Sequence, residues 1–455
     1  MARLLVRIHT ISGTADDPAG LAPAVMRALG LREGRRYRLR CGTRRATARF
    51  WGDGSLGVGR LVLPAPLARR LLLPAPLTAA VGPAGDGVLE IGPLVGLLTP
   101  RRLLATMQDR GLQPPYSHYV RFALEAGAVP VLFAPGRLDR RARSVRGCLP
   151  AEIGPGPRHL VTVEVPLPRV VFHAFNSLER PEAEEFESVA PRLGCLIVDG
   201  WQRIPKPVAY DILRQHRWLD RHVPATDRLT PQALRAALSR YDDLYLKPDA
   251  GARGEGVYRL TQARRGWVLT TEGNRGPLEI RLPDRAAVLA AVRKRLARGT
   301  PYLLQEGLPL ATFLGNRFDL RALAQKNGRG RWVLAGLAAR VAPPGSPITS
   351  PLRGALVARP VDVLRLAFPG RWHEVLNDVH RVVLAAAEAI DRALGPRFEI
   401  GVDIAVLQDG TIKIIEVNGA PRKTSLEMLR DPLIAERVYR LPIHYAIGLA
   451  LRGDG

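Results

Sequence analysis

Three oxygen-bearing side chains in the segment 398–421, those of Asp403, Glu416 and Asn418, could hold a metal ion. Two carboxylates that face each other on neighbouring strands repel, so a cation is expected between them. Carboxylate and amide oxygens are ligands that Mg²⁺ and Mn²⁺ prefer. The same residues leave open an ordinary exposed hairpin whose acidic side chains pair with neighbouring arginines.

The hairpin that would position these side chains is predicted by the sequence FEIGVDIAVLQDGTIKIIEVNGAP. Asp409 and Gly410 tolerate the positive φ angles of a type I′ turn, so they predict a two-residue turn between two strands. Counting outward from this turn places Asp403 directly opposite Glu416. Asn418 is one two-residue step further along the same face.

A glycine-rich loop follows the predicted strand LYLK, which ends at Lys247. In the loop PDAGARGEGV, Gly251, Gly254 and Gly256 allow backbone amides to approach a ligand, and the lysine could reach its phosphates. The loop lacks both the GK[ST] of a P-loop and the GxGxxG of a dinucleotide site. A phosphate-binding loop and a plain surface loop therefore both remain open.

The short predicted strand in YLLQEGL ends at Gln305 and Glu306, and Gly307 interrupts it. Backbone groups at such a strand end could hydrogen-bond an adenine edge, and the carboxylate could accept a ribose hydroxyl. A strand followed by an exposed turn explains this segment equally well.

Charged residues alternate with apolar ones in FDLRALAQKN. A period of two places Asp319, Arg321 and Leu323 on one face of a strand. A charged pair on an otherwise apolar strand needs a partner or a ligand. Arg321 can contact a phosphate with two N–H groups, and Arg340, which ends the next strand, can add a second contact.

These segments lie in the last of three regions. Residues 1–98 alternate short apolar stretches with Gly and Pro and predict a β-rich domain. Residues 99–205 alternate helical and strand patterns and predict an α/β layer. Residues 206–452 contain every candidate residue named above, with a subdomain at about 240–304 that contains the glycine-rich loop.

The composition predicts a cytoplasmic protein of two or three domains. The chain has 455 residues, 46% of them hydrophobic, and lacks an apolar run of the roughly 20 residues that a membrane helix needs. The start MARLLVRIHTI is typical of a first strand rather than of a signal peptide. Cys41, Cys148 and Cys195 are widely spaced, which predicts reduced thiols and no zinc motif.

A net charge of +25 raises the question of nucleic-acid binding. Arginine supplies nearly all the basic charge and is spread through the chain, as a coding bias would produce, and the chain shows no nucleic-acid-binding motif. We therefore expect neither nucleic acid nor membrane as the main partner. Where one of the few lysines persists, it indicates a place for a compact, strongly hydrated charge.

Taken together, the segments resemble the ATP-grasp superfamily, and more closely its YheC/YheD branch, described as endospore-coat-associated proteins. The order and spacing of the blocks carry this resemblance, which covers Lys206 with the helix after it, KPDAGARGEGV, LLQEGL, FDLRALAQKN and EIGVDIAVLQDGTIKIIEVNGAP. It implies an α/β fold in which two α+β subdomains close on ATP, preceded by the β-rich domain and an α/β pre-ATP-grasp layer.

The resemblance also implies a role for each candidate residue. Arg321 and Arg340 would stabilise charge on the transferring phosphoryl group, and Asp403, Glu416 and Asn418 would hold Mg²⁺, with Mn²⁺ as an alternative. The residues implied to bind ATP are Lys206, Lys247, Gly251, Gly254, Gly256, Gln305, Glu306, Gly307, Asp319 and Lys326.

Two departures from the family pattern concern the loops. Arg253 stands where the family loop often has serine, and the Thr-Asn…Gly-Gly loop appears as Thr349, Ser350, Gly354 and Ala355. The second departure falls near the implied acceptor site, so it puts the substrate more in question than ATP.

The function implied by the resemblance is an ATP- and Mg²⁺-dependent ligase. It would phosphorylate a carboxylate, and an amine or similar nucleophile would capture the acylphosphate. The carboxylate and the amine are not identified by the sequence. The alternative is a nucleotide-binding structural protein of the spore coat that has no turnover, located in the cytoplasm or at the coat beside other coat proteins.

Overall fold

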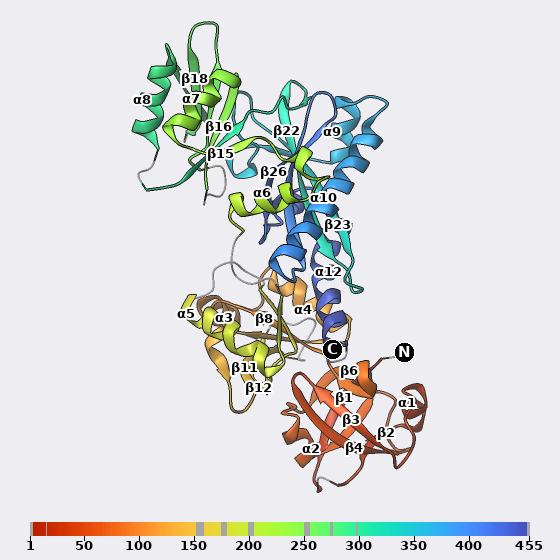
Figure 1. Cartoon of the computed structure of the whole chain (residues 1–455). Helices are drawn as coiled ribbons and strands as arrows, with labels where there is room; N and C mark the ends of the chain where they lie inside the picture. The colour runs from red at the N-terminus through yellow and green to blue at the C-terminus, as the bar shows by residue number, and fades with distance from the viewer. Residues whose placement is uncertain are drawn as a thin grey trace. The chain divides into compact units, whose positions relative to one another are not determined.

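The computed structural model describes residues 3–14, 16–151, 159–173, 180–198, 204–249, 255–273, 276–296 and 299–452 (Figure 1). The chain divides into two compact units. The first comprises Met1–Gln202, Lys326–Arg331 and Tyr439–Gly455, and the second comprises Arg203–Gln325 and Trp332–Val438. Among the described residues, we find no helix with the length and apolar character that a bilayer crossing requires.

The first unit begins with seven strands that close into a barrel. Its elements are β1 (Leu4–Ile11), β2 (Ala19–Leu21), α1 (Pro23–Ala28), β3 (Arg36–Cys41), β4 (Arg44–Gly52), β5 (Arg60–Pro64), α2 (Ala65–Arg70), β6 (Leu77–Pro83), η1 (Gly85–Gly87) and β7 (Val88–Ile91). The strand order is β1-β5-β2-β4-β3-β7-β6. Alternation determines the inner face, since Ala46, Ala48 and Phe50 of β4 are buried and the residues between them are exposed.

A mixed sheet follows the barrel in the chain. Its elements are β8 (Leu94–Leu98), α3 (Arg101–Arg110), α4 (Tyr116–Glu125), β9 (Val129–Phe133), η2 (Pro135–Arg137), β10 (Leu138–Asp139), β11 (Ser144–Pro150), β12 (Leu160–Pro166), β13 (Val170–His173), α5 (Arg180–Val189), η3 (Ala190–Leu193) and β14 (Leu196–Val198). The order is β10-β11-β9-β8-β13-β14, and β12 pairs with β11. β8 falls inside the range predicted as the first domain, yet it pairs in parallel with β9 and β13 of this sheet.

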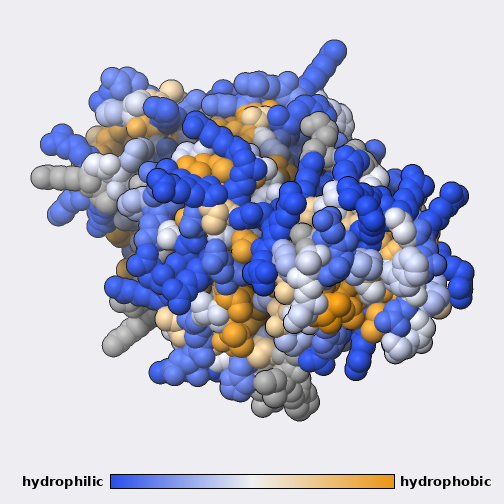
Figure 2. Space-filling view, turned by 90° about the horizontal axis from the view of Figure 1, so that it is seen from below, coloured by the Kyte–Doolittle hydropathy of each residue, from blue (hydrophilic) through white to orange (hydrophobic). Residues whose placement is uncertain are grey.

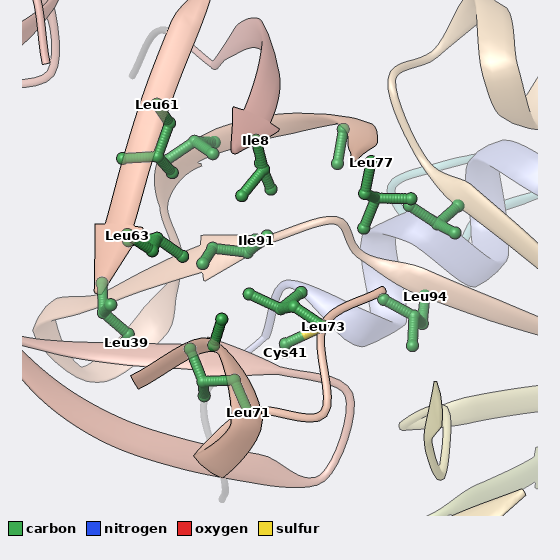
Figure 3. Packing of buried hydrophobic residues seen from close by; sticks show 14 of the residues in the cluster. Ile8, Leu39, Cys41, Leu61, Leu63, Leu71, Leu73, Leu77, Ile91 and Leu94 are labelled. Carbon is green, nitrogen blue, oxygen red and sulfur yellow. The ribbon is translucent and has the colours of Figure 1, made fainter. Parts of the chain in front are cut away.

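The barrel and the mixed sheet share one hydrophobic core. Buried residues such as Ile8, Leu63 and Ile91 of the barrel belong to the same cluster as Val131 and Val171 of the sheet. Figure 3 shows the barrel part of this cluster, with Leu94 of β8 beside Leu73 and Leu77. The regions 1–98 and 99–205 therefore pack as one unit.

The first sheet of the second unit is antiparallel and has the order β15-β20-β16-β17-β18-β19. Its elements are β15 (Thr226–Arg228), α7 (Pro231–Arg240), β16 (Asp243–Pro248), β17 (Tyr258–Gln262), β18 (Trp267–Gly273), β19 (Gly276–Leu282), α8 (Arg285–Arg295) and β20 (Tyr302–Glu306). The side chains of Thr230 and Asp284 cap the two helices by accepting backbone N–H groups. This sheet includes most of the subdomain expected at about 240–304.

The second sheet of this unit carries the predicted hairpin and has the order β24-β23-β22-β25-β26, with β21 paired to β22. The strands are β21 (Thr312–Phe313), β22 (Asn316–Lys326), β23 (Trp332–Val341), β24 (Leu356–Ala358), β25 (Glu399–Val406) and β26 (Ile412–Asn418). The helices are α6 (Lys206–Gln215), η4 (Asp220–His222), η5 (Pro351–Arg353), α9 (Pro360–Ala367), α10 (Trp372–Leu394), α11 (Thr424–Met428) and α12 (Pro432–Ala450).

The long helix α10 packs against both strands of the hairpin. It packs against β23, β25, β26 and α6, and helical spacing places Val375, Val379 and Val382 on its buried stripe. Gly395 follows α10 with a φ of +89°, a conformation that favours glycine. The helical pattern VLNDVHRVVLAAAEAIDRALG before the hairpin predicts a helix that ends at Gly395, and the structure confirms this end.

The face of the molecule in Figure 2 is mostly hydrophilic. Hydrophobic residues on this face form several small, separate groups rather than one continuous area. This pattern is ordinary for a protein surface.

Candidate functional site

The hairpin β25–β26 places Asp403 directly opposite Glu416, as predicted. The predicted two-residue turn, however, is wrong. Leu407 N–H donates to Thr411 O and Gly410 N–H donates to Leu407 O, both at 2.9 Å, so the loop is one residue longer. Only Gly410 has a positive φ here, +88°, which is typical of a three-residue hairpin loop.

A β-bulge in the hairpin restores the predicted pair. Near the loop, Ile404 lies opposite Ile414, whereas Asp403 lies opposite Glu416, so Ile415 is an extra residue in β26. The longer loop and the bulge each shift the register by one residue, in opposite directions. Counting residues from the turn missed both shifts. They cancel each other at Asp403 and Glu416, so the predicted pairing of these two residues is correct.

Asp403 belongs to a buried group of two aspartates and two arginines, which we call the acid–arginine cluster (Asp319, Arg321, Arg340 and Asp403). Arg340 donates to both carboxylate oxygens of Asp319, at 2.7 and 2.5 Å. It also lies 3.1 Å from Asp403 Oδ2, and Arg321 Nη1 lies 2.9 Å from Asp403 Oδ1. Thr349 Oγ1 donates to Asp319 at 2.6 Å.

Burial and charge act in opposite directions on the two aspartates. Burial favours the neutral form of Asp403, but Arg321 and Arg340 outweigh it and hold the pKa of that carboxyl below its usual value. For Asp319, burial dominates and raises the pKa, although Arg340 opposes the shift. The aspartates therefore pair with arginines, as the alternative in the sequence allowed, but this is not an exposed hairpin. Asp319, Arg340 and Asp403 are buried and Arg321 is half-buried.

Two lysines lie beside this cluster in the same unit. Lys206, the first residue of α6, has its Nζ 3.5 Å from Glu416 Oε1 and 3.4 Å from Pro248 O. Lys247 of β16 donates from Nζ to Gln305 Oε1 at 2.6 Å. Burial lowers the pKa of Lys247 to about 8, with a contribution from Lys206 and opposition from Glu416.

A chain of side-chain hydrogen bonds joins the two sheets of the second unit. Lys247 donates to Gln305, whose Nε2 donates to Tyr210 Oη at 3.1 Å and to Thr226 Oγ1 at 2.9 Å. Tyr210 Oη in turn donates to the backbone oxygen of Ile415 at 2.6 Å. The Tyr210 hydroxyl therefore provides a hydrogen-bond donor for the carbonyl of Ile415. Ile415 is the bulge residue, and the bulge places Glu416 opposite Asp403.

Replacement of Tyr210 by Phe should destabilise the second unit by about 1–3 kcal/mol, since a buried carbonyl and a buried amide lose a partner. Urea denaturation would measure this loss. Tyr258→Phe is the matched control, because the Tyr258 hydroxyl makes one exposed hydrogen bond of 3.5 Å. Equal stability of the Tyr210 and Tyr258 variants would contradict a role for Tyr210 in holding the bulge.

Other predicted residues have structural partners of their own. Glu306 Oε1 accepts the N–H of Ala225 at 2.9 Å. Gly307 donates its N–H to Asp243 O at 2.7 Å, and a Cβ there would lie 2.2 Å from Asp243 Cγ. Glycine is thus required at position 307 by close packing.

Four further residues were predicted to bind ATP, namely Gly251, Gly254, Gly256 and Lys326. Gly256 has a φ of +69° at the end of the glycine-rich loop, whereas Gly251 and Gly254 lie outside the described residues. Lys326 ends β22, donates to Tyr445 Oη at 3.4 Å and lies over the Tyr445 ring.

Some buried polar atoms on the hairpin and on the strand beside it have no hydrogen-bond partner among the described residues. They include Asn418 Nδ2 and Arg321 Nε, whereas Asp403 Oδ1 lies 2.9 Å from Arg321 Nη1. The structure contains no group of three His, Cys, Asp or Glu side chains with metal-site spacing in its described part. Two facing carboxylates and one amide nevertheless form a donor set that suits Mg²⁺ when a ligand supplies further oxygens.

Sequence reasoning missed Tyr210 and Thr226. Tyr210 lies in KPVAYDILRQ, where its helical position is that of a core residue, and only its hydroxyl distinguishes it. The hydroxyl of a buried tyrosine needs a hydrogen-bond partner, but the sequence does not identify that partner.

Comparisons with known proteins identify the family of the chain. Residues 200–449, more than half of the chain, match the family model described as YheC/D like ATP-grasp. The chain is 27% identical over 353 residues to the endospore coat-associated protein YheD of Bacillus subtilis (strain 168), covering 74% of this chain and 75% of YheD. It is 26% identical over 233 residues to YheC of the same strain, covering 51% of this chain and 63% of YheC.

Among solved structures, the ATP-grasp ligase PsnB complexed with a phosphomimetic precursor variant, Mg and ADP is similar with a TM-score of 0.42 and 15% identity. The similarity covers 77% of this chain and 98% of that one. A TM-score of this size adds nothing to the assignment, which depends on the family match. The chain belongs to the YheC/D-like ATP-grasp family.

Proposed function

We propose that the second unit binds ATP with Mg²⁺ and uses it to activate a carboxylate as an acylphosphate, which an amine or similar nucleophile then captures. The observation that supports this proposal most is the charge arrangement around the hairpin. Two facing carboxylates lie beside Arg321, Arg340 and Lys206, in a chain that belongs to an ATP-grasp family.

The proposed exchange of ion-pair partners follows from these contacts. The phosphates of ATP would offer new anionic partners to Arg321, Arg340 and Lys206, whose present partners are Asp403 and Glu416. The oxygens of the two acids would then be available to a cation. Bound Mg²⁺ would supply charge neutralisation at the phosphates, and Asp403, Glu416 and Asn418 would hold it.

The remaining candidate residues would bind and orient ATP. Lys247, held by Gln305, would contact the phosphates, and the arginines would stabilise charge that develops on the phosphoryl group in flight. Gly256 and the rest of its loop would cover the nucleotide, while Gln305, Glu306 and Gly307 would line the adenine and ribose. Asp319 would hold Arg340 in position through its two hydrogen bonds.

The release of ADP tests this proposal. The full chain is incubated with ATP, Mg²⁺ and pools of amino acids, peptides or cell-wall precursors, and ADP is measured over time. Sustained release that depends on an added pool is the expected result. Tight ATP binding without release in any pool would favour the alternative, a nucleotide-binding structural protein.

The structural alternative has its own support. The two curated relatives are named endospore coat-associated proteins, and the loop at Thr349, Ser350, Gly354 and Ala355 departs from the family pattern. A location at the spore coat is proposed in either case. A stable phosphorylated product without ligation would instead indicate phosphoryl transfer to a small molecule.

Nucleotide affinity should fall as the pH rises through about 8, the pKa to which burial lowers Lys247. Below this pH the ammonium is charged and can bind phosphate, and above it the group is neutral. If only the charged form binds, the apparent Kd at pH 9 is about tenfold higher than at pH 7.

Calorimetry of ATP binding between pH 7 and 9 would measure this change. Lys247→Arg keeps its charge throughout and should remove the pH dependence. Lys294→Arg, at an exposed position on α8, is the control and should retain the dependence. A wild-type affinity that stays constant over this range would contradict the role of Lys247.

A further inference from the structure

The first unit contains a cavity of about 610 Å³ whose wall is dominated by arginine. Seven arginines line it together with Gly42, Thr43, Leu193 and Gly194. Of the described residues that form the wall, none is acidic. We propose that this cavity, the arginine pocket, binds a small anion that carries several phosphate groups.

Several parts of the unit contribute these arginines. Arg44 and Arg45 begin β4 of the barrel, Arg141 and Arg143 lie between β10 and β11, and Arg192 lies in η3 of the mixed-sheet region. Residues far apart in the sequence therefore converge on one cavity. A random distribution of basic charge over the surface does not by itself gather seven arginines in the wall of one cavity.

Backbone contacts hold the barrel and the mixed-sheet region together at this place. Thr43 donates its N–H to Leu167 O at 2.9 Å, and Arg44 donates from Nη2 to Ala142 O. Gly42 has a φ of +53°, and a Cβ there would lie 2.6 Å from Leu167 O. The turn that carries Thr43 and Arg44 is thus fixed by close contact, which sets the geometry of the wall before any ligand binds.

Two other arginines are oriented by carbonyl groups or by an acid. Arg169 Nη1 donates to Ala450 O at 2.7 Å and to Arg452 O at 2.9 Å. Arg40, which is 1% exposed, pairs with the equally buried Glu90. Carbonyl acceptors orient a guanidinium without changing its charge, so these two contacts hold the Arg169 side chain in a defined orientation.

Polar atoms in the wall lack partners of their own. Arg44 Nε and Thr43 Oγ1 are buried and have no hydrogen-bond partner among the described residues. Buried donors that lack a partner are rare in folded proteins, and a ligand is one explanation for them. An oxyanion would satisfy both, since an N–H and a hydroxyl can each donate to it.

The chemistry of arginine and the volume together select the class of ligand. Guanidinium groups bind phosphate and carboxylate oxygens with two parallel hydrogen bonds, and several of them suit a ligand with several anionic groups. The volume lies within the roughly 300–1,000 Å³ of small-molecule sites. A small polyphosphorylated molecule fits both conditions, and this inference does not depend on the function proposed for the second unit.

Sodium tripolyphosphate is a suitable probe, titrated without Mg²⁺ into the full chain in a calorimeter. The double variant Arg141→Gln/Arg192→Gln changes two exposed arginines of the wall, and the control Arg69→Gln/Arg70→Gln changes two exposed arginines of α2 in the same unit. Both variants lose the same charge. We expect the first to weaken tripolyphosphate binding about tenfold or more and the control to leave it unchanged.

Three results would overturn the proposal. These are an equal loss in both double variants, no loss in either, or tighter and steeply salt-dependent binding of a single-stranded oligonucleotide in place of tripolyphosphate. The gain in ATP affinity that Mg²⁺ provides is assigned to the second unit, so it should be the same in the pocket variant as in the wild type. The proposal for the arginine pocket and the proposed function of the second unit can therefore be refuted independently of each other.

Discussion

Magnesium-dependent ATP binding is expected to disappear in the double variant Asp403→Asn/Glu416→Gln. The two carboxylates face each other across the hairpin, and each amide removes a negative charge that a cation needs. Calorimetry of ATP binding with and without Mg²⁺ would measure the change. The wild type should bind more tightly with Mg²⁺, and the variant should show no such gain.

Asp409→Asn is the control for this experiment. It removes one negative charge from the same hairpin, but at the exposed turn, where Asp409 accepts the N–H of Thr411 at 2.8 Å. This variant should bind as the wild type does. Undiminished Mg²⁺ dependence in the Asp403/Glu416 variant would refute the metal assignment.

Loss of stability should be largest for Arg340→Met. Arg340 is buried and pairs with both Asp319 and Asp403. Its removal leaves Asp319 buried with the Thr349 hydroxyl but without an opposite charge, which costs on the order of 3–5 kcal/mol. Denaturation by urea, followed by fluorescence, would measure the free energy of unfolding.

The pH dependence of this variant gives a second test. Without Arg340, burial holds the pKa of Asp319 even further above its unfolded value, so the folded state prefers the protonated form. The contribution to stability is then present at low pH and is lost as the pH rises through the folded pKa. The difference in the free energy of unfolding between Arg340→Met and the wild type should accordingly be smaller at pH 5 than at pH 8.

Arg381→Met provides the comparison for Arg340. Arg381 pairs with Asp378 on the surface of α10, where both side chains are largely exposed. Such pairs contribute about 0–1 kcal/mol, so this variant should be close to the wild type. A loss for Arg340→Met no greater than that for Arg381→Met would show that the buried cluster does not stabilise the fold.

The strands and helices around the site could be predicted because their signals are local. Alternation in FDLRALAQKN predicted β22, and Gly395 predicted the end of α10. The facing of Asp403 and Glu416 was predicted as well, although the turn was not. The difference between a two-residue and a three-residue loop depends on backbone angles that Asp-Gly permits in both cases.

The bulge could not be predicted, because a hydrogen bond that it makes comes from outside the hairpin. Tyr210 comes from α6, some 200 residues earlier in the chain, and its hydroxyl satisfies the carbonyl of Ile415. The sequence contains neither the proximity of α6 to β26 nor the need of that carbonyl for a donor. Such a contact is decided by packing in three dimensions.

The sequence alone determined the hairpin acids, the strand that carries Arg321, and the resemblance to an ATP-grasp family, because turns, alternation and block order are properties of the chain itself. The tertiary structure decided which charges meet. Arg340 of β23 contacts Asp319 on the adjacent strand β22 and Asp403 on β25, the strand beyond it. Arginines from the barrel and the mixed-sheet region line one cavity. Charge partners depend on strand order and packing, which connect residues that the chain itself keeps far apart.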